Sequence, residues 1–184
     1  MKPVTRRRTL QLAWRQEGVT PIPCEIERTF RLHHAMVFRT AYRITGNAAD
    51  AEDVLQTVFL RLVRRSEAAK PLENAQSYLR RAAVNASIDL MRSRQSDRSV
   101  QLFEVPSRAP QQDAGELREV LRLALARLNP RSAEIFSLRF FEDFHNQEIA
   151  RMLNISIVTV AVTVHRARRQ LRKELASYLG ERHE

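Results

Sequence analysis

The chain carries FHNQEIARMLNISIVTVAVTVHRARRQLR at residues 144–172, where apolar residues recur at helical spacing in two runs. The runs are Ile149, Ala150 and Leu153, and then Ile157, Val160, Val164 and Leu171. Between them, Asn154 tolerates the left-handed conformation that ends a helix, and Ser156 can cap the next helix. A helix, a tight turn and a longer helix with a basic end are typical of a helix-turn-helix, which lays its second helix in the DNA major groove. The alternative is an ordinary helical hairpin in an all-α bundle.

The composition favours a helical protein with a polyanionic partner. Of 184 residues, 43% are hydrophobic, and only 4 are glycine and 7 proline. The formal net charge is +10 and the pI about 11.0, which points to nucleic acid or an anionic membrane surface. The cations gather in clusters rather than along the whole chain, which disfavours a histone-like, purely electrostatic binder.

Other features bound the cellular context. The single cysteine, Cys24, excludes an intramolecular disulfide framework and fits a reducing compartment. No apolar run approaches the roughly 20 residues that span a bilayer. The basic start at residues 6–8 resembles a twin-arginine signal superficially, but residues 15–17 are polar and interrupt the apolar part. We therefore expect a cytoplasmic protein without membrane insertion.

No metal site or cofactor is expected. His33 and His34 are adjacent on a predicted helix and point about 100° apart, so they cannot chelate one ion together. The other three histidines are scattered at positions 145, 165 and 183. No glycine-rich phosphate loop appears either.

The chain divides into two small helical domains joined by a flexible linker. We expect a flexible basic arm at 1–23, a first domain at 24–97, a linker at 98–112 and a second domain at 113–184 that contains the helix-turn-helix. The linker carries two prolines and lacks helical periodicity. Within the domains, Asn74 and Asn129 are predicted helix caps, the latter followed by Pro130 at the first helical position.

The predicted helix that opens at Asp50 has two different faces. Its core stripe is nearly complete and consists of Ala51, Val54, Leu55, Val58, Phe59, Leu62 and Val63. The opposite face carries Asp53, Gln56, Thr57 and Leu60. An exposed leucine among polar residues indicates a protein-docking surface, although single exposed apolar residues are common.

The next predicted helix, from Asn74 to about Ser96, gathers cations beside an aromatic residue and amides. The group comprises Asn74, Tyr78, Arg80, Arg81, Asn85, Arg92, Arg94 and Arg98. Such a group suits a strand-separated nucleic acid, whose bases stack and whose phosphates need neutralising. A solvated basic helix face is the alternative.

Two separated stretches resemble one family. DAEDVLQTVFLRL (50–62) together with YLRRAAVNASIDLMR (78–92) is similar to region 2 of sigma-70-type transcription initiation factors. LNPRSAEIFSLRF (128–140) through VHRAR (164–168) resembles region 4 of the same factors. With only a short linker between the regions, the chain looks like the compact extracytoplasmic-function (ECF) group.

The resemblance implies a function and partners. The chain would be a sigma factor rather than an enzyme, a monomer when free, and would bind core RNA polymerase at the β′ clamp helices and the β flap. It would direct the polymerase to specific promoters and help to melt the −10 element. An anti-sigma factor is a further candidate partner.

The resemblance also implies three sets of site residues. Asp50, Asp53, Gln56, Thr57 and Leu60 would bind the polymerase. Asn74, Tyr78, Arg80, Arg81, Asn85 and Arg92 would hold the opened −10 strand. Ser156, Val158, Thr159, Val162, Thr163, Arg166 and Arg169 would read the −35 duplex.

The sequence departs from the family pattern at both DNA-binding regions. Tyr78 stands where a tryptophan is common, and still offers a stacking face. On the recognition helix, the usual lysine, serine and arginine correspond to Ala161, Val162 and Thr163, and a usual glycine to Val158. Apolar side chains can contact thymine methyl groups but lose charge-assisted contacts. We therefore expect an altered −35 preference and a shallower salt dependence of this contact.

Two alternatives remain open. A free-standing transcriptional regulator would use the same helix-turn-helix but has no need for the exposed face of the 50–62 helix. A metal-dependent nuclease could use Asp50, Glu52, Asp53 and Glu73, but no motif places further ligands beside them.

Overall fold

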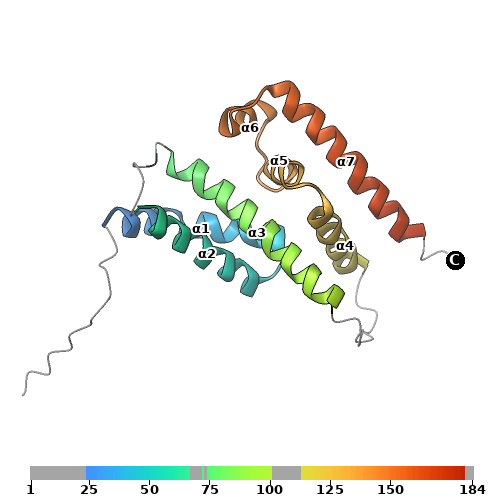
Figure 1. The fold of residues 1–184 in the computed structure, drawn as a ribbon, viewed down its shortest axis with the longest axis horizontal. Helices are drawn as coiled ribbons and strands as arrows, with labels where there is room; N and C mark the ends of the chain where they lie inside the picture. Colours follow the sequence, from blue (N-terminus) through green and yellow to red (C-terminus); the bar gives the residue numbers. More distant parts are fainter. Residues whose placement is uncertain (1–23, 67–71, 73, 101–112, 181–184) are drawn as a thin grey trace, which may run out of the picture.

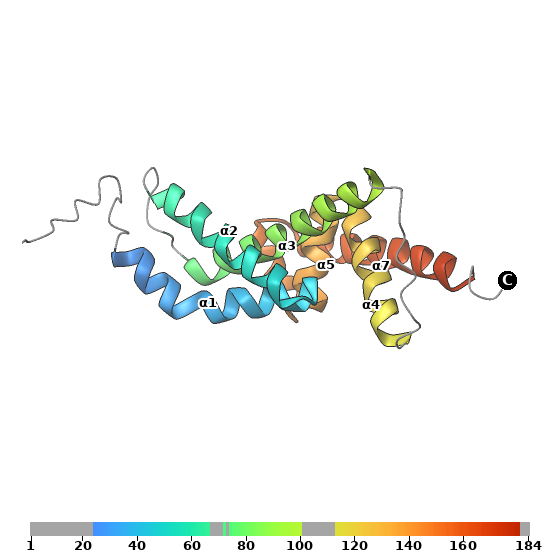
Figure 2. The ribbon, with the colours of Figure 1, turned by 90° about the horizontal axis from the view of Figure 1, so that it is seen from below.

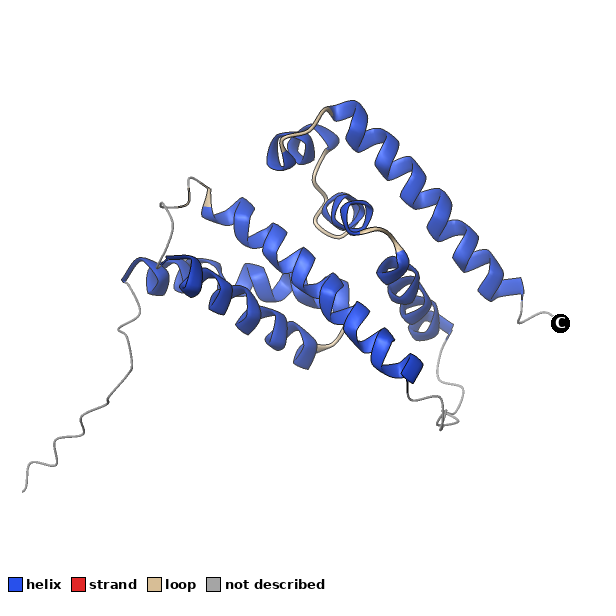
Figure 3. Ribbon diagram, in the orientation of Figure 1, coloured by secondary structure: helices blue, strands red, loops and turns tan. Residues whose placement is uncertain are grey.

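The computed structural model describes residues 24–66, 72, 74–100 and 113–180. Within these ranges all regular structure is helical, which confirms the all-α prediction (Figure 3). The helices are α1 (Cys24–Thr45), α2 (Ala48–Ser66), α3 (Ala75–Val100), α4 (Asp113–Arg127), α5 (Pro130–Phe140), α6 (Asn146–Leu153) and α7 (Ile157–Gly180). The predicted arm at 1–23 and most of the predicted linker lie outside the described residues.

Local capping signals place two helix starts. The Asn74 side chain accepts a hydrogen bond from the backbone N–H of Ser77 at 2.9 Å, at the start of α3. The Asn129 side chain accepts one from the N–H of Ser132 at 2.8 Å, and Pro130 follows as the first residue of α5. Both caps were predicted because asparagine satisfies N–H groups that have no partner within the helix.

The turn between α6 and α7 has the predicted geometry of a helix-turn-helix. Asn154 is left-handed, with φ of 51° and ψ of 51°, and ends α6. The Ser156 hydroxyl then accepts the backbone N–H of Thr159 at 3.0 Å and caps α7. Ile149 and Leu153 of α6 and Val160 of α7 are buried, so the apolar faces of both helices are turned to the protein core.

Two helix ends differ from the sequence-based boundaries. Helix α3 continues to Val100, so the first three residues of the predicted linker are helical. Residues 96–100 contain neither glycine nor proline, so nothing in the sequence ends the helix there. Helix α4 begins at Asp113 rather than near Gly115, since a carboxylate complements the positive end of a helix.

Helices α1–α3 form an N-terminal domain and α4–α7 a C-terminal domain, and α3 runs between the two (Figures 1 and 2). The N-terminal core contains the predicted stripe of α2, with Ala51, Val54 and Val58 fully or almost fully buried.

The two domains are in direct contact, which the sequence did not predict. Ile44 of α1 and Val84 and Ile88 of α3 are almost fully buried, and they belong to the core of the C-terminal domain. Fully burying such a side chain contributes about 1.5–3 kcal/mol. The domains therefore share apolar surface and are not merely tethered by a linker.

The described residues show neither a metal-binding cluster nor a single membrane-spanning helix. There, no group of three or more His, Cys, Asp or Glu side chains is arranged to hold a metal ion. In the same ranges no single helix has the length and hydropathy to cross a membrane; α6 and α7 meet that requirement only as a pair, across a 111° bend. Cys24 is a free thiol and is exposed.

Gly46 ends α1 and gives a stability prediction. Its φ is +67°, and a Cβ added there would lie 1.6 Å from Nη2 of Arg122 on α4. Arg122 can move, but the left-handed backbone costs a non-glycine residue about 1–2 kcal/mol. We expect Gly46→Ala to lower the free energy of unfolding by about that amount in urea titrations.

Gly115 on α4 is the matched control for Gly46. A Cβ there meets nothing within 4 Å, and its φ is not positive. Gly115→Ala should leave stability unchanged or raise it by up to about 1 kcal/mol, because alanine favours a helix. Equal effects of the two substitutions would contradict the proposed role of the Gly46 conformation.

Candidate nucleic-acid interface

The α2 face predicted for protein docking is exposed at most of its positions. Asp53 and Gln56 are exposed, and Leu60 is 56% exposed, a high value for a large apolar side chain. Thr57 is half-buried. Three of the predicted docking residues are thus free to contact another molecule.

Asp50 differs from the other predicted docking residues, which is a correction. It is 7% exposed, and Nη1 of Arg94 on α3 donates a hydrogen bond to its carboxylate at 2.6 Å. As the third residue of α2 it also complements the positive helix end. We assign Asp50 the structural role of joining α2 to α3 and leave it out of the docking face.

At the start of α3, the contacts of Asn74 and Tyr78 are with residues of the N-terminal domain. Asn74 is exposed and serves as a cap, and Tyr78 is half-buried against the N-terminal core. The Arg65 guanidinium lies over the Tyr78 ring, 5.3 Å from its centroid. The ring face thus already holds one planar cation, as a stacking surface would.

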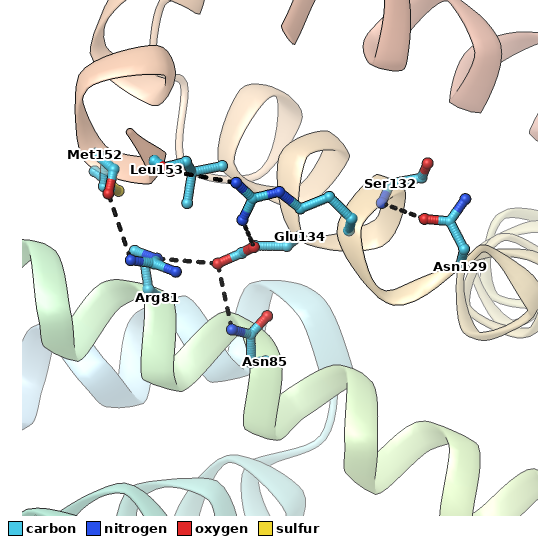
Figure 4. A network of polar contacts seen from close by, with 8 residues as sticks. Arg81, Asn85, Asn129, Ser132, Glu134, Met152 and Leu153 are labelled. Carbon is cyan, nitrogen blue, oxygen red and sulfur yellow. Dashed lines mark hydrogen bonds and ion pairs between the residues drawn. The ribbon is translucent and has the colours of Figure 1, made fainter. Parts of the chain in front are cut away.

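Further along α3, Arg81 and Asn85 bind a carboxylate of the C-terminal domain (Figure 4). Nε of Arg81 and the Asn85 amide donate to the same oxygen of Glu134 at 3.0 and 3.3 Å. The other oxygen accepts from Arg131 of α5 at 2.9 Å. Arg81 and Arg131 also donate to the backbone carbonyls of Met152 and Leu153, at the end of α6.

Arg80 binds a second buried carboxylate, Glu142, which follows α5. The Glu142 side chain is 1% exposed, and its other oxygen lies 3.4 Å from Nη1 of Arg43 on α1. Arg43 also donates to the backbone carbonyl of Phe141 at 3.1 Å. The Arg80 guanidinium lies 5.3 Å from the ring centroid of Phe144. Both cations of this site come from the N-terminal domain.

Arg92 binds the C-terminal end of α4. Its Nε donates to the carbonyl of Ala126 at 3.0 Å and its Nη2 to that of Leu128 at 2.7 Å. Carbonyls at a helix end have no partner within the helix, and a cation there also complements the helix dipole. A cavity of about 370 Å³ lies beside this contact, lined by Asn85, Ile88, Asp89, Arg92, Pro130, Arg131 and Glu134.

Four of the six residues predicted to hold the −10 strand are therefore in contact with the C-terminal domain. Sequence reasoning did not single out their partners, Glu134 and Glu142. One signal was available for Glu134: it stands within the apolar run 133–138, and a buried carboxylate requires a cationic or hydrogen-bonding partner.

The predicted recognition face of α7 is exposed and short of free polar groups. Val158 and Val162 are 66% and 42% exposed. The Thr163 hydroxyl donates to the carbonyl of Thr159 at 2.7 Å, and the Thr159 hydroxyl lies 2.8 Å from that of Ser156. Arg166 and Arg169 are exposed and add charge further along the helix.

Two protein families match most of the described chain. Sigma-70 region 2 matches residues 29–97, and Sigma-70, region 4 matches residues 118–171. The first match lies in α1–α3, and the second spans the helix-turn-helix.

Individual relatives agree with these matches. The RNA polymerase sigma-E factor of Streptomyces coelicolor is 33% identical over 83% of this chain and 87% of its own length. The ECF RNA polymerase sigma factor SigE of Mycolicibacterium smegmatis is 33% identical over 82% of this chain and 62% of its own. The sigma factor RpoE of Bartonella quintana, crystallised with the anti-sigma factor NepR, is 19% identical over 83% of this chain and 97% of its own, with a TM-score of 0.49. The chain belongs to the ECF group of the sigma-70 family, the RNA polymerase subunits that direct transcription initiation to specific promoters.

Proposed function

We propose that the chain divides promoter recognition among three surfaces, one on each of α2, α3 and α7. The observation that carries this proposal is the exposed Asp53–Gln56–Leu60 face of α2 on a chain that also has a helix-turn-helix. A free-standing regulator needs only the helix-turn-helix. A polymerase subunit needs a separate protein-docking face, and we assign it to α2, where it would contact the β′ clamp helices.

The N-terminal half of α3 is the proposed −10 surface, which helps to melt the duplex. Asn74 and Tyr78 would hold an unstacked base, with the Tyr78 ring as stacking platform. Arg80, Arg81, Asn85 and Arg92 would bind the phosphates of the opened strand. Arginine suits that role because its guanidinium donates two parallel hydrogen bonds to one phosphate.

The proposed −35 surface is the exposed start of α7. Val158 and Val162 lie one helical turn apart and both side chains are exposed. They could therefore pack on thymine methyl groups in the major groove. Arg166 and Arg169 would bind phosphates, and Ser156, Thr159 and Thr163 would shape the start of the helix.

The remaining partners follow from this assignment. The chain would act in the cytoplasm, where core polymerase and promoter DNA are found, with the β flap contacting the C-terminal domain and without catalysis of its own. One solved relative is paired with an anti-sigma factor, so a protein inhibitor is a candidate partner here as well.

The α2 face gives the test of function. Asp53→Arg combined with Gln56→Ala should weaken binding to purified bacterial core RNA polymerase about tenfold or more, which corresponds to about 1.4 kcal/mol. The reason is that a larger side chain of the opposite charge would enter the centre of the interface. Binding can be measured by fluorescence anisotropy of the chain labelled at Cys24.

Glu27→Arg is the matched control for this charge reversal. Glu27 is exposed on α1, where its pair with Arg31 is largely solvated and contributes little to stability. The control should bind core polymerase like the wild type. Absence of core binding by the wild type, with specific duplex binding retained, would identify a free-standing regulator instead.

The α7 face gives a second prediction, tested on a duplex selected from a random library with the wild-type chain. Replacing its thymines by deoxyuridine removes methyl groups and should weaken wild-type binding. The same replacement should weaken Val162→Ala less than the wild type, because that variant has already lost about 1 kcal/mol of apolar contact and keeps only Val158 to contact methyl groups. Equal sensitivity of both chains to the replacement would rule out methyl contacts by Val162.

Salt dependence separates the phosphate contacts from the apolar ones. Arg166→Ala should reduce the slope of log affinity against log salt by about one unit, and Val162→Ala should leave it unchanged. The wild-type slope should correspond to fewer than about six released ions, since residues 157–164, the start of the recognition helix, contain no lysine or arginine. A steeper slope would contradict the proposal that the recognition face of α7 binds DNA mainly through apolar contacts.

A further inference from the structure

The Tyr78 ring has a planar cation over one of its faces. The Arg65 guanidinium, from the last turn of α2, lies 5.3 Å from the ring centroid. We propose that Arg65 is a further DNA-binding residue, which stacks on the outer face of the unstacked −10 base while Tyr78 stacks on its inner face. The inference rests on the function proposed for Tyr78 and adds the group that completes the base site.

The Tyr78 side chain is held in place by the protein, as a stacking platform must be. Its backbone N–H donates to the carbonyl of Asn74 at 3.1 Å, in the first turn of α3, and its ring is half-buried against the N-terminal core. The next residue, Leu79, is 0% exposed and fixes that turn in the core. Because the core lies against the ring, a base has to approach it from the side that Arg65 now covers.

Arg65 differs from the neighbouring arginines of α3 in its partners. Arg80 and Arg81 are each paired with a carboxylate of the C-terminal domain. Arg65 is exposed, and within the described residues it has no carboxylate partner, only the contact with the Tyr78 ring. Its charge and its planar group are therefore both available to DNA.

The helix dipole explains a cation at the end of α2 but not its position over the ring. Arg64 and Arg65 both lie in the last turn, where cations complement the negative end of the helix. The dipole acts on both and does not direct either toward an aromatic ring. A guanidinium is planar and weakly hydrated, and it stacks on aromatic rings and on nucleobases with the same geometry. The group over Tyr78 is thus of the kind that stacks on a base.

A base fits between the two groups after a small movement of Arg65. Stacked atoms lie about 3.5–4.0 Å apart, so a base with a partner on each face needs about 7–8 Å between the partners. The present distance from the ring centroid to Cζ of Arg65 is 5.3 Å. The additional 2–3 Å, roughly, is within the reach of a rotamer change in a long, exposed side chain. The guanidinium therefore closes onto the ring without DNA and onto the base with DNA.

Removal of single bases separates stacking on the base from binding to a phosphate. The probe is a promoter duplex selected from a random library by core RNA polymerase that carries the wild-type chain. It is premelted by mismatches at its −10 element, and each base of the opened non-template strand is replaced in turn by an abasic site. The captured base is the one whose removal weakens wild-type binding most and Tyr78→Ala binding least.

The expected result for Arg65→Gln depends on that base. On the intact strand this variant, in complex with saturating core polymerase, should bind about threefold more weakly than the wild type, the size of an exposed cation–π contact. With the captured base removed, the two should bind equally, because the group on which Arg65 stacks is gone.

Arg64→Gln is the matched control, since Arg64 is exposed, adjacent and of the same charge. Any loss of affinity in this variant comes from electrostatics or a phosphate contact, and should be the same with and without the captured base. If Arg65→Gln likewise loses the same affinity on the intact and the abasic strands, Arg65 binds a phosphate and the proposal is overturned.

Arg65→Lys separates stacking on the base from mere support of the Tyr78 ring. Lysine keeps the charge and can contact the ring as a cation, but it has no planar surface. Stacking predicts that Arg65→Lys loses about as much affinity as Arg65→Gln on the intact strand. If lysine restores wild-type binding, Arg65 only supports the ring and the proposal is overturned.

The Tyr78→Ala variant distinguishes failure of this inference from failure of the proposed function. If Tyr78→Ala loses affinity that depends on one captured base and Arg65→Gln does not, Tyr78 is the stacking platform and only the role of Arg65 is wrong. If base removal affects the wild type and Tyr78→Ala equally at every position, Tyr78 captures no base and both assignments are wrong.

Discussion

Two carboxylates buried between the domains constrain the rest of the structure. The side chains of Glu134 and Glu142 are 6% and 1% exposed, and a buried charge is costly unless cations and hydrogen-bond donors surround it. Arg131 supplies part of this environment from α5, but Arg43, Arg80, Arg81 and Asn85 come from α1 and α3. Removing one partner of such a site leaves an uncompensated charge, so the positions of α1 and α3 relative to α5 are tied to these two side chains.

Local signals in the sequence were sufficient to predict the helices and their caps. They were not sufficient to predict contacts between residues far apart in the chain. The Asn74 and Asn129 caps, the left-handed Asn154 and the core stripe of α2 depend on residues within one or two turns, and the structure confirms them. Arg81 and Glu134 are 53 residues apart, and no spacing rule links them. For the same reason the docking role that the family resemblance implied for Asp50 did not anticipate its contact with Arg94 on another helix. The family resemblance assigned roles to α3 side chains but did not indicate their contacts in the free chain.

The contact between the domains uses the same α3 side chains that are proposed to bind promoter DNA. Arginines suited to phosphates are equally suited to carboxylates, so the chemistry proposed for the opened −10 strand also allows the chain to bind its own C-terminal domain.

The packed contact between the two domains, with Glu134 and Glu142 buried in it, is the feature on which the rest of the structure depends most. Pulsed electron spin resonance between spin labels on Cys24 and on Gln147→Cys measures it directly, because both sites are exposed and lie on different domains. We predict a single short distance distribution in the wild-type free chain and a longer or broader one when Glu134→Gln and Glu142→Gln remove the buried carboxylates. The same distribution in both samples, or a long and broad one in the free chain, would contradict the claim.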